Sequence, residues 1–220
     1  MIYKLSRPIF DDERRWPKIQ PGSLTAPHST ATESAGGEPM EPMTHAGTGV
    51  EAPCPFVSGA EWVDLLPPDR FQGLCVALDM RHKEAGCGIT TADLEPHAEQ
   101  IQRGVIVLLK TGWGDKRALS REFLTAWPYL SSEAAEVLVS RDIHGVGIEG
   151  LGIAGFHDRD KETCAHRVLR GAGKLLVEDL RVPEAMLDGR FRHFAASPVR
   201  IDRTSEAWTR AVAWDEGEAA

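Results

Sequence analysis

Residues 104–113 read GVIVLLKTGW, an apolar run rich in β-branched residues that begins with glycine and has a second glycine near its end. An uninterrupted apolar run of this length is typical of a strand that is buried on both faces of its sheet. Residues 73–80, GLCVALDM, have the same character. The two stretches therefore predict two buried strands.

Helical segments separate the apolar runs. Residues 90–103 start with Thr and carry acidic residues in the first turn, as the N-terminus of a helix prefers. Two more helices are predicted over 130–142, capped by Ser131 or Ser132, and over 160–173, which ends in glycine. Further strands are predicted over 143–150, 174–180, 191–201 and 209–214. This alternation predicts an α/β fold with a partly parallel sheet, because a parallel connection needs a helical crossover.

Length and composition predict a single domain. The chain has 220 residues, of which 42% are hydrophobic and 26% charged, so it is long enough for one sizeable core. We therefore assign residues 1–220 to one domain. Residues 11–44 are rich in Pro, Gly and Ser and have few apolar anchors, so this stretch is predicted to be a loop or arm.

The net charge limits the kinds of binding partner, and the cysteine spacing indicates the redox state of the compartment. Asp and Glu outnumber Lys and Arg by 33 to 25, which gives a net charge of −8 and makes nucleic acid and anionic membranes poor partners. The chain starts without a signal-peptide pattern and has no apolar stretch long enough for a membrane helix. We expect a soluble cytoplasmic protein with reduced thiols, because the cysteines are scattered without paired spacing: Cys54, Cys75, Cys87 and Cys164.

Most of the chemical information lies in residues 44–56, THAGTGVEAPCPF. In a regular extended backbone His45 and Glu51 would point to the same face, bracketed by glycines and prolines. Such a face can donate or accept a proton or bind a metal. A second interpretation is a Gly/Pro-rich turn in which His45 forms a local hydrogen bond and Glu51 is solvated.

The same stretch carries a resemblance to a known family. HAGTGVEAPCP resembles H-x-G-T-H-x-D-x-P-x-H, the signature of the metal-dependent cyclase and kynurenine formamidase family, to which isatin hydrolases also belong. Some signature positions are kept and others differ. The kept residues are His45, Gly47, Thr48 and Pro53, whereas Gly49 stands for the second His, Glu51 for Asp and Pro55 for the last His.

The resemblance continues in collinear order along the chain. YKLSRPIF is similar to the opening D-L-S-x-P-I of the family, VIVLLKTGW to its V-L-L-R-T-G-W, and HGVGIEG to its V-G-I-D. SPVR and TRAVA resemble its closing strands. The resemblance implies one swivelling β/β/α-like domain with a mixed sheet flanked by helices, and a homo-oligomer.

It also implies further site residues. Family members supply a His from the third helix and a Glu from the strand after it, and these positions match His166 and Glu178. With His45 and Glu51 they form the predicted catalytic set, and the same four would be the ligands of any bound metal. The aromatic residues Phe56, Trp62 and Trp113 are candidate walls of a substrate pocket. Each could instead have a structural role, His166 in a helix, Glu178 on an edge strand and the aromatics in the core.

The departures from the signature predict a changed mechanism. Gly49 and Pro55 have no side chain that can coordinate, so zinc or manganese is expected to be lost or weakly bound unless Cys54, His157 or water completes the site. Glu51 would then act as a general base, with an imidazole as its acid partner.

Three functions remain open at this point. The first is a divergent biosynthetic enzyme that acts on a small carbonyl-containing metabolite by cyclisation, elimination, isomerisation or acyl transfer. The second is a metal-dependent hydrolase of amides or lactams. The third is a pseudoenzyme that binds a small molecule or a partner protein.

Overall fold

The computed structural model describes residues 1–8, 23–24, 40–41, 44–53, 59, 61–116, 120–157 and 164–216. Most of the predicted arm over 11–44 lies outside these residues. Within it, β2 (Ser23–Leu24) pairs antiparallel with β3 (Met40–Glu41). Cys54 and Phe56 also lie outside the described part of the chain.

One mixed sheet of nine strands organises the described residues, in the order β1-β13-β11-β5-β7-β9-β10-β4-β12. Its central strands β5, β7, β9 and β10 run parallel, and the strands on either side pair antiparallel. Their bounds are β1 (Ile2–Lys4), β4 (Gly49–Glu51), β5 (Gln72–Asp79), β7 (Ile106–Lys110), β9 (Gly145–Ile148), β10 (Leu175–Glu178), β11 (Arg192–Ala195), β12 (Glu206–Trp208) and β13 (Val212–Trp214). Two short strands, β6 (Gly88–Ile89) and β8 (Tyr129–Leu130), pair separately.

The helices are short. They are α1 (Thr91–Leu94), α2 (Arg121–Thr125), α3 (Ser132–Ser140) and α4 (Ala165–Gly171), with 3-10 turns η1 (Val63–Leu65), η2 (Pro68–Phe71), η3 (Glu95–His97), η4 (Trp113–Asp115) and η5 (Glu184–Met186). Ser131 caps α3, as predicted, by accepting a hydrogen bond from the Ala134 amide at 3.1 Å. The helix predicted over 90–103 keeps its Thr90 cap but changes to 3-10 geometry at Glu95, because Pro96 has no amide hydrogen to donate to the carbonyl four residues earlier.

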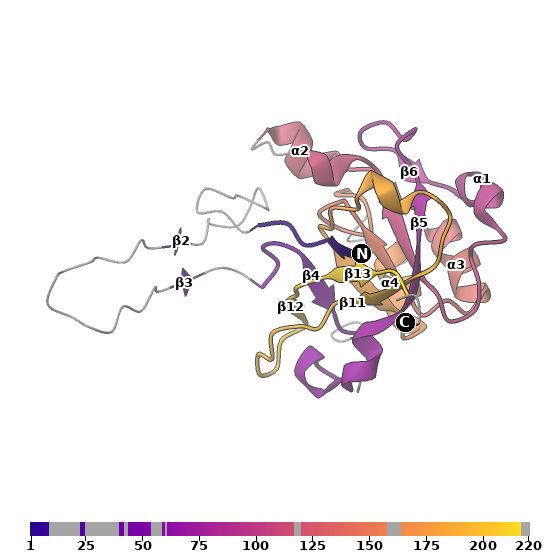
Figure 1. Cartoon of the computed structure of the whole chain (residues 1–220). Helices are drawn as coiled ribbons and strands as arrows, with labels where there is room; N and C mark the ends of the chain where they lie inside the picture. The colour runs from indigo at the N-terminus through magenta and orange to yellow at the C-terminus, as the bar shows by residue number, and fades with distance from the viewer. Residues whose placement is uncertain are drawn as a thin grey trace, which may run out of the picture.

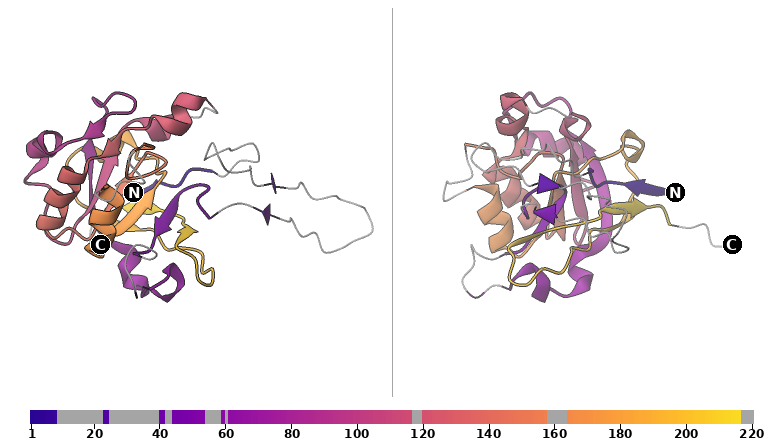
Figure 2. Two further views of the ribbon diagram at one scale, coloured as in Figure 1. Left: turned by 180° about the vertical axis from the view of Figure 1, so that it is seen from behind. Right: turned by 90° about the vertical axis from the view of Figure 1, so that its left-hand side faces the viewer.

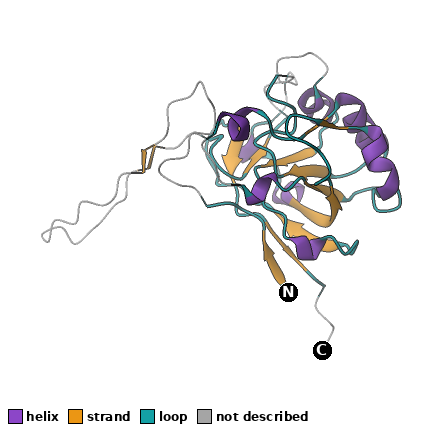
Figure 3. Cartoon of the chain, turned by 90° about the horizontal axis from the view of Figure 1, so that it is seen from above, coloured by secondary structure: helices purple, strands orange, loops and turns teal. Residues whose placement is uncertain are grey.

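Two apolar layers lie on opposite faces of the sheet. Helices α1, α3 and α4 cover one face, where Leu138 and Leu169 pack against strand residues such as Leu109 (Figures 1 and 3). On the other face the curled outer strands enclose a second core that includes Val50 and Phe194 (Figure 2). The predicted α/β class, with a mixed sheet flanked by helices, is confirmed.

The C-terminal segment differs from the prediction. Two strands joined by a polar turn were expected over 191–214, whereas the structure has three. The additional strand, β12, leaves β11 and β13 and pairs with β4 at the far edge of the sheet (Figure 1). Three residues give too short an alternation to indicate a strand from sequence alone. This strand carries Glu206 to the site described below.

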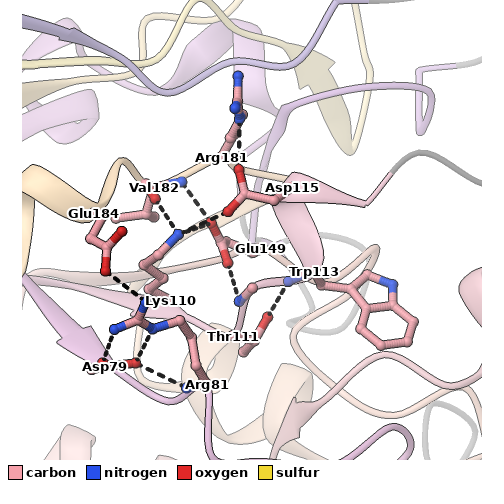
Figure 4. A network of polar contacts seen from close by, with 11 residues as sticks. Asp79, Arg81, Lys110, Thr111, Trp113, Asp115, Glu149, Arg181, Val182 and Glu184 are labelled. Atoms are coloured by element: carbon pink, nitrogen blue, oxygen red, sulfur yellow. Dashed lines mark hydrogen bonds and ion pairs between the residues drawn. The ribbon is translucent and has the colours of Figure 1, made fainter.

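A buried ion pair ties the carboxyl ends of the parallel strands together (Figure 4). The ammonium group of Lys110 lies 3.5 Å from the Glu149 carboxylate, 3.2 Å from Asp115, and donates to the Val182 carbonyl at 2.7 Å. Glu149 in turn accepts hydrogen bonds from the amides of Gly112 and Val182 at 2.6 and 2.8 Å. Burial raises the pKa of Glu149, and the charge of Lys110 opposes that rise.

The first and last strands of the sequence pair at one edge of the sheet. The Met1 amino group forms an ion pair with Asp215 at 3.1 Å, and β1 pairs with β13. No helix within the described ranges is both long and apolar enough to cross a membrane.

Candidate functional site

Gly47 and Thr48, which match the Gly-Thr pair of the signature, have a structural role. Gly47 adopts φ = 95°, in the left-handed region that favours glycine, so the chain turns before β4. The Thr48 hydroxyl donates to the Asp179 carbonyl at 2.7 Å and accepts a hydrogen bond from the Arg7 amide at 2.9 Å. The turn is thereby joined to the end of β10 and to the N-terminal segment.

Strand register brings three carboxylates onto one face of the sheet. Glu51 on β4 lies directly opposite Glu206 on β12, and Glu178 on β10 lies opposite Gly49. Side chains two residues apart on a strand share a face, so Glu51, Glu178 and Glu206 point to the same side. Their side chains are at most 5% exposed. Like charges at directly opposite positions destabilise a sheet unless a proton or a cation lies between them.

Helix α4 supplies two basic groups to this face. His166 and Arg170 are four residues apart and therefore lie one turn apart on the same side of the helix. His166 Nε2 lies 2.8 Å from Glu178 Oε1 and 3.5 Å from Glu51 Oε2. The Arg170 guanidinium contacts the same oxygen of Glu51. Both basic side chains are almost fully buried.

A second imidazole lies nearer the surface. His45 Nε2 is 2.9 Å from Glu206 Oε2, and the His45 side chain is 30% exposed whereas that of Glu206 is 3% exposed. Its other ring nitrogen lies 3.2 Å from the Thr44 hydroxyl. The site thus has an outer His45–Glu206 pair and an inner group formed by Glu51, His166 and Glu178.

The close approach of these buried ionisable groups shifts the pKa values of His166 and Glu206. Burial alone would lower the pKa of His166, but the charges of Glu51 and Glu178 outweigh it and raise the pKa to about 9. Burial raises the pKa of Glu206 to about 7; its hydrogen bond with His45 opposes the rise and the charge of Glu51 adds to it. Both shifts favour the protonated forms of His166 and Glu206.

Two further contacts fix the inner group. The Ile153 amide donates to Glu178 Oε1 at 2.7 Å. Cys164, which precedes α4, contacts His166 through its thiol. Burial alone would raise the pKa of Cys164, but the contact with His166 outweighs this effect and lowers it. The inner imidazole and carboxylate are accordingly held from several sides.

The four predicted catalytic residues converge in the structure. Glu51 belongs both to an outer group with His45 and Glu206 and to an inner group with His166 and Glu178; within each group one ligand atom per residue lies within 4.8 Å of the others. Residues more than a hundred positions apart therefore share one site. Their catalytic roles remain predictions.

Of the candidate wall residues, Trp62 and Trp113 lie within the described ranges, and both pack with apolar core residues. Trp113 is 2% exposed and stacks on Phe123 with ring centroids 6.0 Å apart, as a core residue does. Trp62 packs with the core on the face of β4 that carries Val50, opposite to Glu51. His157, named as a possible replacement ligand, is exposed and contacts Phe156.

Sequence reasoning missed Glu206 and Arg170. A Cβ atom added to Gly49 would lie 2.6 Å from Glu206 Oε1, so the Glu206 carboxylate occupies the space beside the position where the signature has its second His. Arg170 could have been noticed because it follows His166 by four residues on one helix. Glu206 had no comparable signal, since it reaches the site only through strand pairing.

The donor set fits a divalent ion in the outer group. One imidazole and two carboxylates at His45, Glu51 and Glu206 are suitable ligands for zinc or manganese. Burial, and then the charge of Glu51, raises the pKa of Glu206, and a cation would favour the ionised carboxylates. The inner group is closed by direct contacts of His166 and Arg170 with the carboxylates. The expected weakening of the metal site remains a prediction.

Comparisons with known proteins agree with this architecture. A solved structure described as "Potential Metal-Dependent Hydrolase With Cyclase Activity" is 26% identical, with a TM-score of 0.79 and 99% of each chain covered. A predicted metal-dependent hydrolase from Bacillus stearothermophilus is 24% identical, with a TM-score of 0.79 over 98% of each chain. Isatin hydrolase A from Ralstonia solanacearum is 20% identical, with a TM-score of 0.83 over 98% of this chain and 92% of its own. No curated protein matched.

Fold and site together define an α/β protein with a cluster of imidazoles and mostly buried carboxylates on one face of its sheet. The profile of the family described as "Putative cyclase" matches residues 3–154, more than half of the chain. The chain belongs to this cyclase family, and the predicted resemblance is confirmed. The matched region includes His45 and Glu51 and ends before His166, Glu178 and Glu206.

Proposed function

We propose that this protein is a hydrolase-like enzyme that adds water to a small cyclic amide or related carbonyl compound, or closes the ring in reverse. The observation that carries the proposal is the pairing of half-exposed His45 with buried Glu206 at 2.9 Å, beside Glu51 and Glu178. Such a pair can move a proton to or from a reacting group at the mouth of the site.

The outer pair is better placed for proton transfer than Glu51. His45 is the most accessible member of the set, and the pKa of Glu206, about 7, suits a group that gains and loses a proton near neutral pH. Glu51 is fully buried and contacts Arg170. We therefore assign His45 and Glu206 to acid–base catalysis, and Glu51 with the inner group to the support of that pair.

Metal-dependent hydrolysis is the second candidate. It is favoured by the outer ligand group and by the 26% identical structure described as a potential metal-dependent hydrolase. A divalent ion held by His45, Glu51 and Glu206 would polarise a carbonyl and lower the pKa of bound water. In that case Glu206 would act as a ligand, and the inner His166–Glu178 pair would keep its supporting role.

Isatin and an N-formyl aryl amide are suitable first substrates, because solved relatives are isatin hydrolases and the family includes kynurenine formamidase. We expect ring opening or deformylation by the wild type and a loss of roughly 10²–10⁴ in turnover for Glu206→Gln and for His45→Asn. The double variant should lose less than the product of the two effects, because the residues act as one unit. Glu51→Gln should also lower turnover, and it should destabilise the protein because Arg170 loses a carboxylate partner.

Chelator distinguishes the two candidates. Activity that survives extensive chelation supports acid–base catalysis alone, and activity that returns only with zinc or manganese supports the metal-dependent alternative. Full activity in both Glu206→Gln and His45→Asn would refute the assignment of the outer pair. Binding of these compounds without turnover would instead favour a pseudoenzyme.

A further inference from the structure

Arg170 is an unusual residue for its position. It lies in the last turn of α4, on the side that faces the sheet, and its side chain is 4% exposed. A guanidinium group cannot lose its proton in a protein, so burial there places a permanent positive charge beside Glu51. Such a burial is unfavourable unless a carboxylate compensates it.

The positive charge of Arg170 offsets the mutual repulsion of the carboxylates of Glu51, Glu178 and Glu206. At a separation of about 5 Å and an effective dielectric constant near 20, two carboxylates repel each other by about 3 kcal/mol. Glu51 faces Glu206 across the sheet and shares His166 with Glu178, so it lies at the centre of the negative charge. Arg170 contacts the Glu51 oxygen that would otherwise be available to a cation.

The inner group therefore offers no room for an ion. A metal bound there would use Glu51 Oε2 and His166 Nε2, but the first contacts Arg170 and the second lies 2.8 Å from Glu178. The outer group is different, because its imidazole, His45, is 30% exposed and faces Glu206. Only the outer group combines ligand atoms with access from solvent.

We infer that Arg170 is a built-in cation that takes the place of a divalent ion in the inner group of Glu51, His166 and Glu178. The chain then binds at most one divalent ion, in the outer group of His45, Glu51 and Glu206. This inference concerns the number of ions and their location, so it does not depend on which substrate the enzyme accepts.

Metal stoichiometry tests the inference. Chelator-treated full-length protein is titrated with Zn²⁺ and separately with Mn²⁺ by calorimetry, and bound metal is counted by elemental analysis after dialysis. We expect no more than one ion per chain in the wild type. Arg170→Leu, which removes the internal cation, should bind one ion more than the wild type and should gain more thermal stability from added metal.

Two control variants separate charge from packing. Arg170→Lys keeps a cation in the inner group and should bind no additional ion. Arg170→Leu combined with Glu51→Gln removes both charges, so it should fold without added metal and should lose the additional ion, because its shared ligand is gone.

The outcomes are distinct from those of the activity assays. Two ions per wild-type chain, or an unchanged stoichiometry in Arg170→Leu, would overturn the inference. If Arg170→Leu folds only when metal is present, that dependence supports it. If this variant cannot be obtained in any buffer, the wild-type count and the double variant decide the question. Inactivity towards every substrate tested would count against the proposed function and leave the stoichiometry unaffected.

Discussion

Glu206 and Gly49 compete for one volume of space. A side chain at position 49 would meet the Glu206 carboxylate, whose oxygen lies 2.6 Å from the Cβ position. The end of a glutamate is flexible, but the Glu206 carboxylate also contacts His45, so moving it away from position 49 would disturb that contact. The loss of the second signature histidine and the presence of Glu206 are therefore two aspects of one arrangement.

Restoring the histidine alone should accordingly fail. We expect Gly49→His to destabilise the protein by roughly 1–3 kcal/mol through overcrowding, with little gain in Zn²⁺ affinity. Gly49→His combined with Glu206→Ala should bind Zn²⁺ more tightly than Glu206→Ala, because the imidazole then has space and restores a third ligand. Calorimetric titration and thermal unfolding of the three variants measure both effects. A large gain in affinity for Gly49→His alone would contradict this explanation.

The site could be predicted in part from the sequence. His45, Glu51, His166 and Glu178 follow from positions in a collinear family pattern, and the structure brings them together. Glu206, which is not part of that pattern, does not follow from it. Glu206 depends on the pairing of β12 with β4, a contact between segments about 150 residues apart that local periodicity does not encode.

Strands β7 and β9 carry a paired substitution. The family pattern has Arg in V-L-L-R-T-G-W and Asp in V-G-I-D, and this chain has Lys110 and Glu149 at those positions. The two side chains meet in the structure at 3.5 Å, in a buried network completed by the amides of Gly112 and Val182 (Figure 4). Compared with the Arg and Asp of the family pattern, the basic side chain is shorter and the acidic side chain is longer.

A double-mutant cycle tests this complementarity. Lys110→Arg should crowd Glu149, and Glu149→Asp should fail to reach both amides, so each single variant should lose about 1–3 kcal/mol of unfolding free energy. The double variant should recover a large share of that loss, with a coupling of at least ~1 kcal/mol measured by urea denaturation. Leu74→Ser, an exposed change on β5, serves as a control that should not couple to either. Strictly additive losses would show that the two positions vary independently.

Among the elements, the long apolar runs were the most predictable. The strands predicted over 73–80 and 104–113 are β5 and β7, because an uninterrupted apolar run of that length has few other stable environments. The short elements were less predictable. The helix predicted over 90–103 was shortened by Pro96, which cannot donate the next α-helical hydrogen bond. Strand β12 went unnoticed because three residues do not establish a period.

The charge of the whole molecule is unevenly distributed. The chain carries a net charge of −8, yet the buried carboxylates of the site are offset from within by Arg170 and by protonated His166. Part of the free energy of unfolding therefore depends on the protons bound to His166 and Glu206 in the folded state. The expected homo-oligomer and the cytoplasmic location remain predictions. The dependence of stability on pH argued below does not rest on either of them.

Stability in metal-free buffer should therefore fall as the pH rises. Folding raises the pKa of His166 from its usual 6.5 to about 9, so its contribution is complete below pH 6.5 and is lost as the pH rises through about 9. Folding also raises the pKa of Glu206 to about 7, which adds a decline between about pH 4.5 and 7. The His166 contribution should be on the order of a few kcal/mol.

Urea unfolding at pH 5 to 9 in the presence of chelator measures this dependence. The wild type should lose unfolding free energy steadily, and His166→Gln should give a flatter curve above pH 6.5, because glutamine has no proton to lose. The general repulsion of a negatively charged chain is common to both proteins, so their difference isolates the imidazole. Added Zn²⁺ should reduce the decline, because ligands bind metal in their deprotonated forms and the bound ion replaces the lost protons. Equal slopes for the two proteins above pH 6.5 would mean that His166 is neutral in the folded state and that Arg170 alone balances the inner carboxylates.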